Sequence, residues 1–361
     1  MEEIAFKLKL LRTALQETGA KGVRLYGTDW FTWATAGASS TVLLTTEVGV
    51  AQILVTARNA WILTDEIEAQ RLQEEELPAH GYELYVHPWA EATRRESFVQ
   101  EVTEGGRVLS DRPDASQNAL PPSLLERKQV MGAAELERYR RVGRLASEAM
   151  SEALFAARPT WTERDLAAAG ARALWTRGLH PALTLAAGER RQLLYRHPTP
   201  TRELLGQRAM LVFCARGHGL YANLTRFVSF GPLPERHTHS HQDLREIEAG
   251  ALELCRPGAA LSPIYWEFHR AYVHYGYPDT IRKQHQGGLT GYLAREVVVG
   301  PQTPGVLVEG MVVAWNPSLP EAKIEDTFAV GAGGLENLTH DPNWPCVQVA
   351  GRPRPLPLER A

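Results

Sequence analysis

Hydrophobic and polar positions repeat with two different periods in the first third of this 361-residue chain. The opening segment, MEEIAFKLKLLRTALQ, has apolar residues at helical spacing, whereas several short later runs are continuously apolar, as buried strands are. We expect strands at 22–27, 48–55, 60–64, 82–89 and 106–111, with a helix at 65–76. This order predicts a small α/β domain.

The order of predicted helices and strands changes after a stretch rich in Pro, Asp and Ser that follows residue 110. From there to the end, a pair of helices alternates twice with strand-rich sequence. We expect helices at 134–157, 163–177, 243–254 and 264–276, with strands over 183–230 and in the remainder. Thr160 and Glu163 have the spacing of a capping box at the start of the second helix. The sequence therefore predicts an α+β protein with domains at 1–131 and 132–361.

Composition limits the kinds of binding partner and the cellular locations that we expect for this chain. The formal charge of -3 is close to neutral, and Lys and Arg are scattered among Asp and Glu, so nucleic acid is a poor candidate partner. Cys214, Cys255 and Cys346 are far apart and odd in number, which gives neither a disulfide framework nor a paired-cysteine metal motif. The first residues lack the form of an export signal, and no uncharged run is long enough for a membrane span. We expect a cytoplasmic protein without a membrane partner.

Five short stretches in the second part carry most of the candidate chemistry. They contain a His-Pro pair before a strand, an Asn-Leu-Thr-Arg run, a glycine-rich segment, an Asn-Pro pair after an apolar run, and a Glu-Asp pair. In chain order they are RHPTPTRELLGQRAMLVF (196–213), GLYANLTRFVSFG (219–231), KQHQGGLTGYLARE (283–296), EGMVVAWNPS (309–318) and KIEDTFAV (323–330).

The order and spacing of these stretches resemble the creatinase, aminopeptidase P and prolidase superfamily, and the segment KGVRLYGTDWFTWATAG (21–37) is similar to its N-terminal domain. The resemblance implies a creatinase-type α/β domain followed by a pita-bread domain with pseudo-two-fold symmetry. It also implies a homodimer in which the loop holding Trp30, Phe31 and Trp33 reaches the partner's site. The alternative is that these aromatic residues belong to an ordinary core.

The chain departs from the superfamily at the positions that hold two metal ions. By the resemblance, Asn223 and Asn316 replace carboxylate ligands, and a further aspartate position falls on Val212. His285 and Glu325 remain as conventional ligands. A pair of divalent ions needs several carboxylates to balance its charge, and a hard cation prefers an anionic oxygen to a neutral amide. We therefore expect neither a metal pair nor another cofactor.

The same stretches supply the candidate site residues. His197 takes the position of the histidine that acts as base in creatinases, so it is the candidate general acid or base. His285 and Glu325 complete the candidate catalytic set. The residues expected to contact substrate are Asn223, Arg226, Tyr292 (at the position of a second family histidine), Arg295, Asn316 and Lys323. For the two arginines the alternative is structural pairing with nearby carboxylates, which we favour for Arg226.

Three other features have simple explanations. His237, His239 and His241 precede a predicted helix and have no partner cluster in the sequence, so we interpret them as a solvated helix entry, not a zinc site. Cys214 has apolar neighbours and is interpreted as a small core residue, not a nucleophile. Gly287-Gly288 is interpreted as a turn or bulge, not a ligand contact.

Three functions remain as alternatives, and the expected ligand is a small molecule or a short peptide. The leading hypothesis is a metal-independent hydrolase acting on a C–N bond of a small, carboxylate-bearing compound. The second is a catalytically inactive module that binds a peptide or protein in the surviving cavity. The third is an Xaa-Pro dipeptidase whose degenerate site still recruits one metal ion.

Overall fold

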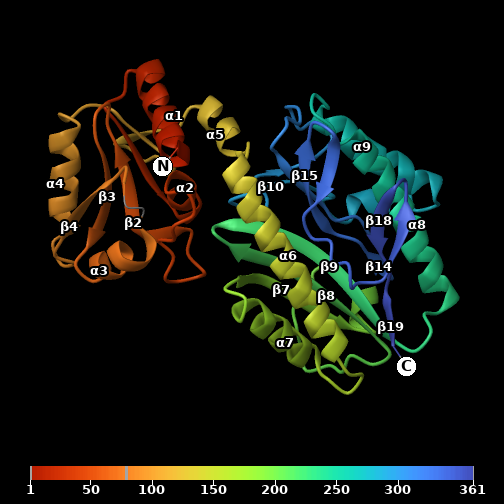
Figure 1. Cartoon of the computed structure of the whole chain (residues 1–361). Helices are drawn as coiled ribbons and strands as arrows, with labels where there is room; N and C mark the ends of the chain where they lie inside the picture. The colour runs from red at the N-terminus through yellow and green to blue at the C-terminus, as the bar shows by residue number, and fades with distance from the viewer. Residues whose placement is uncertain (1, 78–79, 361) are drawn as a thin grey trace. The chain divides into compact units, whose positions relative to one another are not determined.

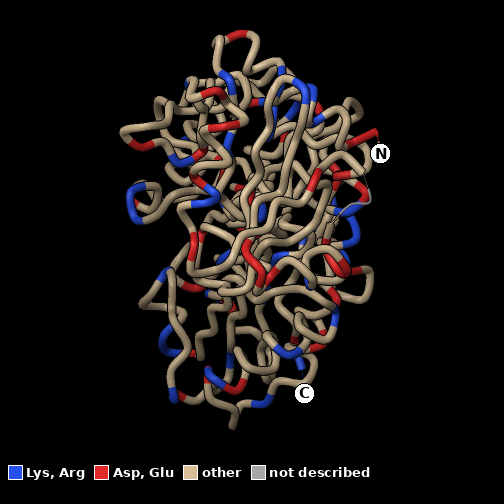
Figure 2. The backbone as a smooth tube through the Cα atoms, turned by 90° about the vertical axis from the view of Figure 1, so that its left-hand side faces the viewer, with Lys and Arg blue, Asp and Glu red and all other residues tan. Residues whose placement is uncertain are grey.

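The computed structural model of the chain describes residues 2–77 and 80–360. It divides into two compact units, residues 1–134 and 135–361, and the predicted α+β class is confirmed. Basic and acidic residues are interspersed along the backbone trace (Figure 2). Among the described helices, none is both long enough and apolar enough to cross a membrane.

Unit 1 is built on a mixed six-stranded sheet of order β4-β3-β2-β1-β5-β6 (Figure 1). Its buried central strands are the apolar runs of the sequence, which lose most contact with water in the sheet. The strands are β1 (Gly22–Gly27), β2 (Val48–Val55), β3 (Ala60–Asp65), β4 (Glu83–His87), β5 (Val108–Ser110) and β6 (Gln117–Ala119). The helices are α1 (Glu2–Thr18), α2 (Thr28–Ala34), α3 (Ala69–Arg71), the π-helical turn η1 (Leu72–Glu76), α4 (Ala92–Val102) and α5 (Pro122–Lys128).

The aromatic residues that the resemblance placed on a loop lie on helix α2 and are buried. Trp30, Phe31 and Trp33 are 4%, 0% and 1% exposed. The two indole rings pack edge to face with centroids 5.4 Å apart, and the ammonium groups of Lys7 and Lys128 lie over them. The expectation of a loop is therefore wrong, and these side chains form part of the core of unit 1.

Unit 2 consists of two sheets, two short hairpins and two pairs of helices (Figure 1). Its helices are α6 (Ala133–Ala156, which begins at the end of unit 1), α7 (Glu163–Trp175), η2 (Arg191–Leu193), α8 (Glu235–Leu254), α9 (Leu261–His274) and η3 (Thr280–Arg282). Its strands are β7 (His180–Gly188), β8 (Arg208–Gly217), β9 (Leu220–Phe230), β10 (Gly287–Thr290), β11 (Val297–Val298), β12 (Val312–Trp315), β13 (Ser318–Leu319), β14 (Ala322–Lys323), β15 (Asp326–Gly331), β16 (Gly334–Asn337), β17 (Cys346–Val349), β18 (Arg352–Pro355) and β19 (Leu358–Arg360).

Helices α6 and α7 cover one face of the four-stranded sheet β19-β9-β8-β7. The core between them contains Met150 and Leu166 from the helices and Leu211 and Phe213 from β8, all 0% exposed. The C-terminal strand β19 completes this sheet by pairing in parallel with β9. Since alternate residues of a strand point to opposite faces, the other face of β9 is left to contact the second sheet.

The second sheet, of order β11-β10-β12-β15-β16, meets the first through an isolated bridge between Thr225 and Glu325. Gly287 and Gly288 lie within its strand β10 in regular register with β12, not in a turn or bulge as expected. Their φ angles are +106° and +153°, and a Cβ atom on either would lie 2.1 Å from a carbonyl oxygen of a neighbouring strand. The glycine pair therefore permits close strand packing.

The capping box of helix α7 is formed by residues other than those expected. Thr162 Oγ1 accepts a hydrogen bond from the Asp165 backbone N–H, and the Asp165 carboxylate accepts one from the Thr162 backbone N–H. Thr160 and Glu163 have the right spacing but lie two residues too early. Asp165 serves as well as the Glu or Gln of the usual motif, since any carboxylate can accept that bond.

Helix α8 begins at Glu235, eight residues before the predicted start, so the histidine run lies within it. His237 and His241 are four residues apart on one helical face and are 8% and 7% exposed, whereas His239 is exposed. The interpretation as a solvated helix entry is therefore wrong for two of the three residues. The missed signal is Pro234, which precedes the first helical residue.

Candidate functional site

The polar side chains of β9 that point away from the helices make contacts with the second sheet. The Asn223 backbone N–H donates to Thr327 Oγ1 at 2.8 Å, and the Asn223 side-chain Nδ2 donates to Thr290 Oγ1 at 3.0 Å. Thr290 Oγ1 itself donates to the carbonyl oxygen of Leu293, so it is free to accept from the Asn223 amide. Asn223 Oδ1 is buried and has no hydrogen-bond partner among the described residues.

The carboxylate of Glu325 is the centre of the site. Arg295 Nη2 lies 2.7 Å from its Oε1, and Lys323 Nζ lies 3.1 Å from its Oε2. Thr225 Oγ1 donates to Oε2 at 3.0 Å. Burial would raise the pKa of Glu325, but the two cations hold the pKa below its ordinary value. Glu325 is therefore ionised, and both of its oxygens are engaged.

Two histidines lie beside this carboxylate. The rings of His197 and His285 have centroids 6.3 Å apart and are inclined at 30°. Desolvation, with Lys323 close by, lowers the pKa of His197; desolvation and then Arg295 lower the pKa of His285. Both imidazoles are thus neutral near pH 7 and can accept a proton.

Asn316 is held against the segment that carries His285. Its backbone N–H donates to the carbonyl oxygen of Gln286 at 2.9 Å, and Gln284 Nε2 donates to the Asn316 carbonyl oxygen at 2.8 Å. Three buried polar atoms here have no hydrogen-bond partner within residues 2–77 and 80–360: Asn316 Oδ1, His285 Nδ1 and Arg295 Nε. Buried polar groups are usually hydrogen-bonded, so these atoms are available to a ligand.

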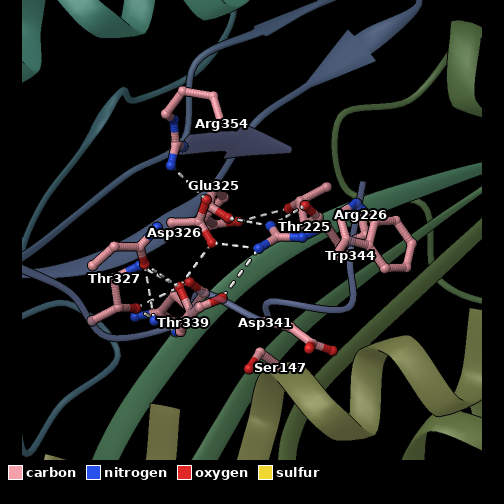
Figure 3. A network of polar contacts seen from close by, with 12 residues as sticks. Ser147, Thr225, Arg226, Glu325, Asp326, Thr327, Thr339, Asp341, Trp344 and Arg354 are labelled. Carbon is pink, nitrogen blue, oxygen red and sulfur yellow. Dashed lines mark hydrogen bonds and ion pairs between the residues drawn. The ribbon is translucent and has the colours of Figure 1, made fainter. Parts of the chain in front are cut away.

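Arg226 belongs to a buried ionic network next to Glu325 (Figure 3). Arg226 Nη2 donates to Asp326 Oδ1 at 2.7 Å, and Thr339 Oγ1 donates to the same oxygen at 2.8 Å. The second oxygen of Asp326 lies 2.9 Å from Arg354 Nη1, and Arg354 also makes two hydrogen bonds of 2.7 Å to Glu248. This arrangement supports the structural role that we favoured for Arg226.

Tyr292 and Cys214 take no part in the contacts of the Glu325 carboxylate described above. The hydroxyl of the buried Tyr292 donates to Glu135 Oε1 at 2.6 Å, so it is directed at helix α6. Cys214 lies opposite Asn223 in the β8–β9 register, and burial raises the pKa of its thiol to about 12. A thiol that is protonated at neutral pH is a poor nucleophile, which agrees with the expectation that Cys214 is not one. Cys214 is only partly buried, so it is not a core residue as expected.

The donors around Glu325 do not fit a pair of divalent metal ions. Val212, opposite Thr225 in the register, offers an aliphatic side chain, and Asn223 and Asn316 offer neutral amides. The carboxylate of Glu325 already has two cationic side chains as partners. No group of three or more His, Cys, Asp or Glu among the described residues has an arrangement that could hold a metal ion.

Sequence reasoning missed three threonines that position these groups, namely Thr225, Thr290 and Thr327. Thr225 lies two residues after Asn223 on β9, so the two-residue period of a strand could have placed both on one face. The other two threonines come from strands far along the chain, and no local pattern indicates their contacts with Asn223.

The comparisons with known proteins agree with this architecture. The model of metallopeptidase family M24 matches residues 137–332. The Xaa-Pro dipeptidase from Bacillus anthracis superposes with a TM-score of 0.77 at 18% identity, covering 94% of this chain and 98% of that chain. The prolidase from Pyrococcus horikoshii OT3 gives a TM-score of 0.73 at 18% identity, with coverage of 92% and 98%.

A protein named for a different role has the same fold. The N-terminal domain of FACT complex subunit SPT16 from Cicer arietinum superposes with a TM-score of 0.71 at 12% identity, covering 94% of this chain and 96% of that chain. No curated protein matches the sequence. The likeness in structure confirms the expected N-terminal mixed-sheet domain and pita-bread domain.

Proposed function

Because this chain belongs to metallopeptidase family M24, we propose that it is a hydrolase homologue that works without a metal pair on a C–N bond of a small, carboxylate-bearing compound. The observation that carries this proposal is the pairing of Glu325 with Lys323 and Arg295 at 3.1 and 2.7 Å. A carboxylate that already has two cations beside it has little charge left to offer a metal ion.

The charge of the site favours an anionic ligand. Lys323 and Arg295 are positive, Glu325 is negative, and the two imidazoles are neutral, so one positive charge is left over. Arg295 Nε is a buried donor that lacks a partner among the described residues, and a substrate carboxylate would accept its hydrogen bond. The unpaired amide oxygens of Asn223 and Asn316 would accept hydrogen bonds from N–H groups of the same ligand.

His197 supplies the acid–base chemistry in this proposal. Its neutral imidazole accepts a proton from a water molecule as the water oxygen attacks the carbon of the C–N bond. The imidazolium then returns that proton to the departing nitrogen as the bond breaks. Water is thereby divided between the two products, and His197 ends in its original state.

A binding module is the second candidate, because neither oxygen of Glu325 is left to act as a general base. The SPT16 domain shares the fold and is named as part of a complex, not as a peptidase. In this case the site recognises a peptide or protein, and His197 contributes no chemistry.

We also extend to this chain the homodimer that the family resemblance implies. Light scattering of the purified protein tests this oligomeric state.

The decisive experiment is hydrolysis by the chelator-treated protein of guanidino acids, N-acylated amino acids and dipeptides that include Xaa-Pro. We expect turnover to persist without metal and to fall by roughly 10²–10⁴ in kcat for His197→Ala, with KM little changed. His239→Ala, at an exposed histidine, is the matched control. Inertness toward the whole panel, with ligand affinity unchanged in His197→Ala, would establish the binding module instead. Activity on an Xaa-Pro dipeptide that returns only with manganese, cobalt or zinc would overturn metal independence.

A further inference from the structure

Arg196, the residue directly before the candidate base His197, is a half-buried cation. Desolvation lowers the pKa of its guanidinium, and the other influence on that pKa is the hydroxyl of Tyr272. Burial raises the pKa of Tyr272, so its hydroxyl is neutral near pH 7 and provides no negative charge. A charge that is taken out of water is normally paired. In the described part of the chain, however, no carboxylate forms an ion pair with Arg196.

The guanidinium of Arg196 is held in place by one of its nitrogens. Its Nη1 atom donates to the carbonyl oxygen of Leu319 at 2.6 Å. Its Nε and Nη2 atoms donate to no group within residues 2–77 and 80–360, and they are not enclosed by the protein. A guanidinium presents its donors as a planar fork that matches the two oxygens of a carboxylate. Arg196 can therefore offer donors to a ligand that arrives from solution.

The hairpin of β13 and β14 places Arg196 beside a cation of the candidate site. Leu319, which accepts the hydrogen bond from Arg196, lies in β13, and Lys323 lies in the paired strand β14. Arg196 and Lys323 also line the same hollow, which is partly open to solvent. Its enclosed volume of about 10 Å³ holds no more than one water molecule, so a group bound to Arg196 lies at its mouth. Since Lys323 contacts Glu325, this mouth adjoins the candidate site.

We propose that Arg196 binds a second carboxylate of the ligand, so that the preferred compounds are diacids such as N-acylated acidic amino acids. The inference rests on the proposed function, in which Arg295 binds the first carboxylate. The cations Lys323, Arg295 and Arg196 face a single negative charge from Glu325, which leaves two positive charges. A ligand with two carboxylates balances both charges, whereas a ligand with one leaves Arg196 uncompensated.

Titration calorimetry of the full chain with matched pairs of ligands tests the proposal. N-acetylglutamate and N-acetylglutamine differ only in the second carboxylate, and so do N-acetylaspartate and N-acetylasparagine. We expect each diacid to bind about tenfold more tightly than its amide, because hydrogen bonds between charged groups are stronger than neutral ones. This preference should disappear in Arg196→Met and be intermediate in Arg196→Lys, which keeps the charge without the fork. Arg202→Met, the same change at an exposed arginine, should keep the full preference.

Three results would overturn the role of Arg196: no binding of either diacid, equal affinities for diacid and amide, or a preference that is unchanged in Arg196→Met. If Arg196→Met does not fold, Arg196→Lys provides the second measurement, and an undiminished preference in that variant overturns the proposal. Turnover of the same compounds tests the hydrolase separately. A preference that depends on Arg196 without any turnover contradicts the hydrolase alone, whereas turnover without the preference contradicts only the role of Arg196.

Discussion

Arg295 Nη2 donates a hydrogen bond of 2.7 Å to Oε1 of Glu325, whose side chain is 3% exposed. The two residues come from different segments, a loop after β10 and the residue before β15. Desolvating two charges costs free energy that their attraction only partly returns, so such a pair adds little net stability. Loss of one member is costly, however, because the other charge then lies in the interior without compensation.

Replacement of Glu325 by Gln should therefore destabilise the protein strongly. The change keeps the shape of the side chain but leaves Lys323 and Arg295 without their shared carboxylate. We expect a loss of about 3–5 kcal/mol in the free energy of unfolding, measured by urea denaturation. Glu309→Gln, at an exposed position, should change it by less than about 0.5 kcal/mol. A similar small effect for Glu325→Gln would contradict the central role of this carboxylate.

Metal content is the second prediction. Protein dialysed without chelator and then reloaded with manganese or zinc should hold close to no metal per chain by elemental analysis. The physical reason is that Lys323 and Arg295 already neutralise the carboxylate of Glu325. A chain carrying Asn223→Asp and Asn316→Glu together with Lys323→Met should bind more metal than wild type. A stoichiometry near two ions in the wild-type chain would restore a conventional peptidase centre.

The pH dependence of any hydrolysis should have an acid limb set by His197. A base must be neutral to accept a proton, and desolvation and Lys323 lower the pKa of this ring from 6.5. The value of kcat/KM should therefore be flat near pH 7 and fall only below pH 6.5. Lys323→Met should move the limb to higher pH, because it removes a cation that opposes protonation. An acid limb that stays in His197→Ala would assign it to another group.

Acid unfolding should depend on His241. Burial lowers the pKa of this residue to about 3, whereas in the unfolded chain it returns to about 6.5. Between those values the unfolded state binds the proton, so stability falls as pH decreases, by up to about 1.4 kcal/mol per pH unit. His241→Phe should flatten this slope, and the exposed His239→Phe should not. Denaturation midpoints between pH 3 and 7 provide the comparison; equal slopes in all three proteins would refute it.

The sequence located most of the candidate site because its signals are local. His197, Asn223, His285, Asn316 and Glu325 each lie in a short stretch whose order resembles a known superfamily, and the structure brings these stretches together at two adjoining sheets. The boundaries of β1, β2 and β3 were similarly accessible, since apolar runs between turn residues determine them. Strands β4 and β5 are shorter than expected, and the short strand β6, which has no apolar run, was missed.

The sequence could not show which carboxylate each buried arginine pairs with, because all carboxylates have the same chemistry. Arg295 had several carboxylates within reach along the chain, and only the folded backbone selects Glu325, 30 residues away. Arg354 and Glu248 are 106 residues apart, and neither attracted attention before the structure paired them. The start of helix α8 was missed because alternating His and polar residues obscured the four-residue spacing of His237 and His241.

The parallel pairing of β19 with β9 has a consequence for synthesis. Leu358 of β19 lies opposite Val228 of β9, so β9 gains this neighbouring strand only after about 130 further residues have been made. On the ribosome, this edge of β9 is unpaired until residues 358–360 emerge, and unpaired edges are where chains associate wrongly. The order of translation thus leaves the nascent chain open to aggregation at this edge until β19 has been made.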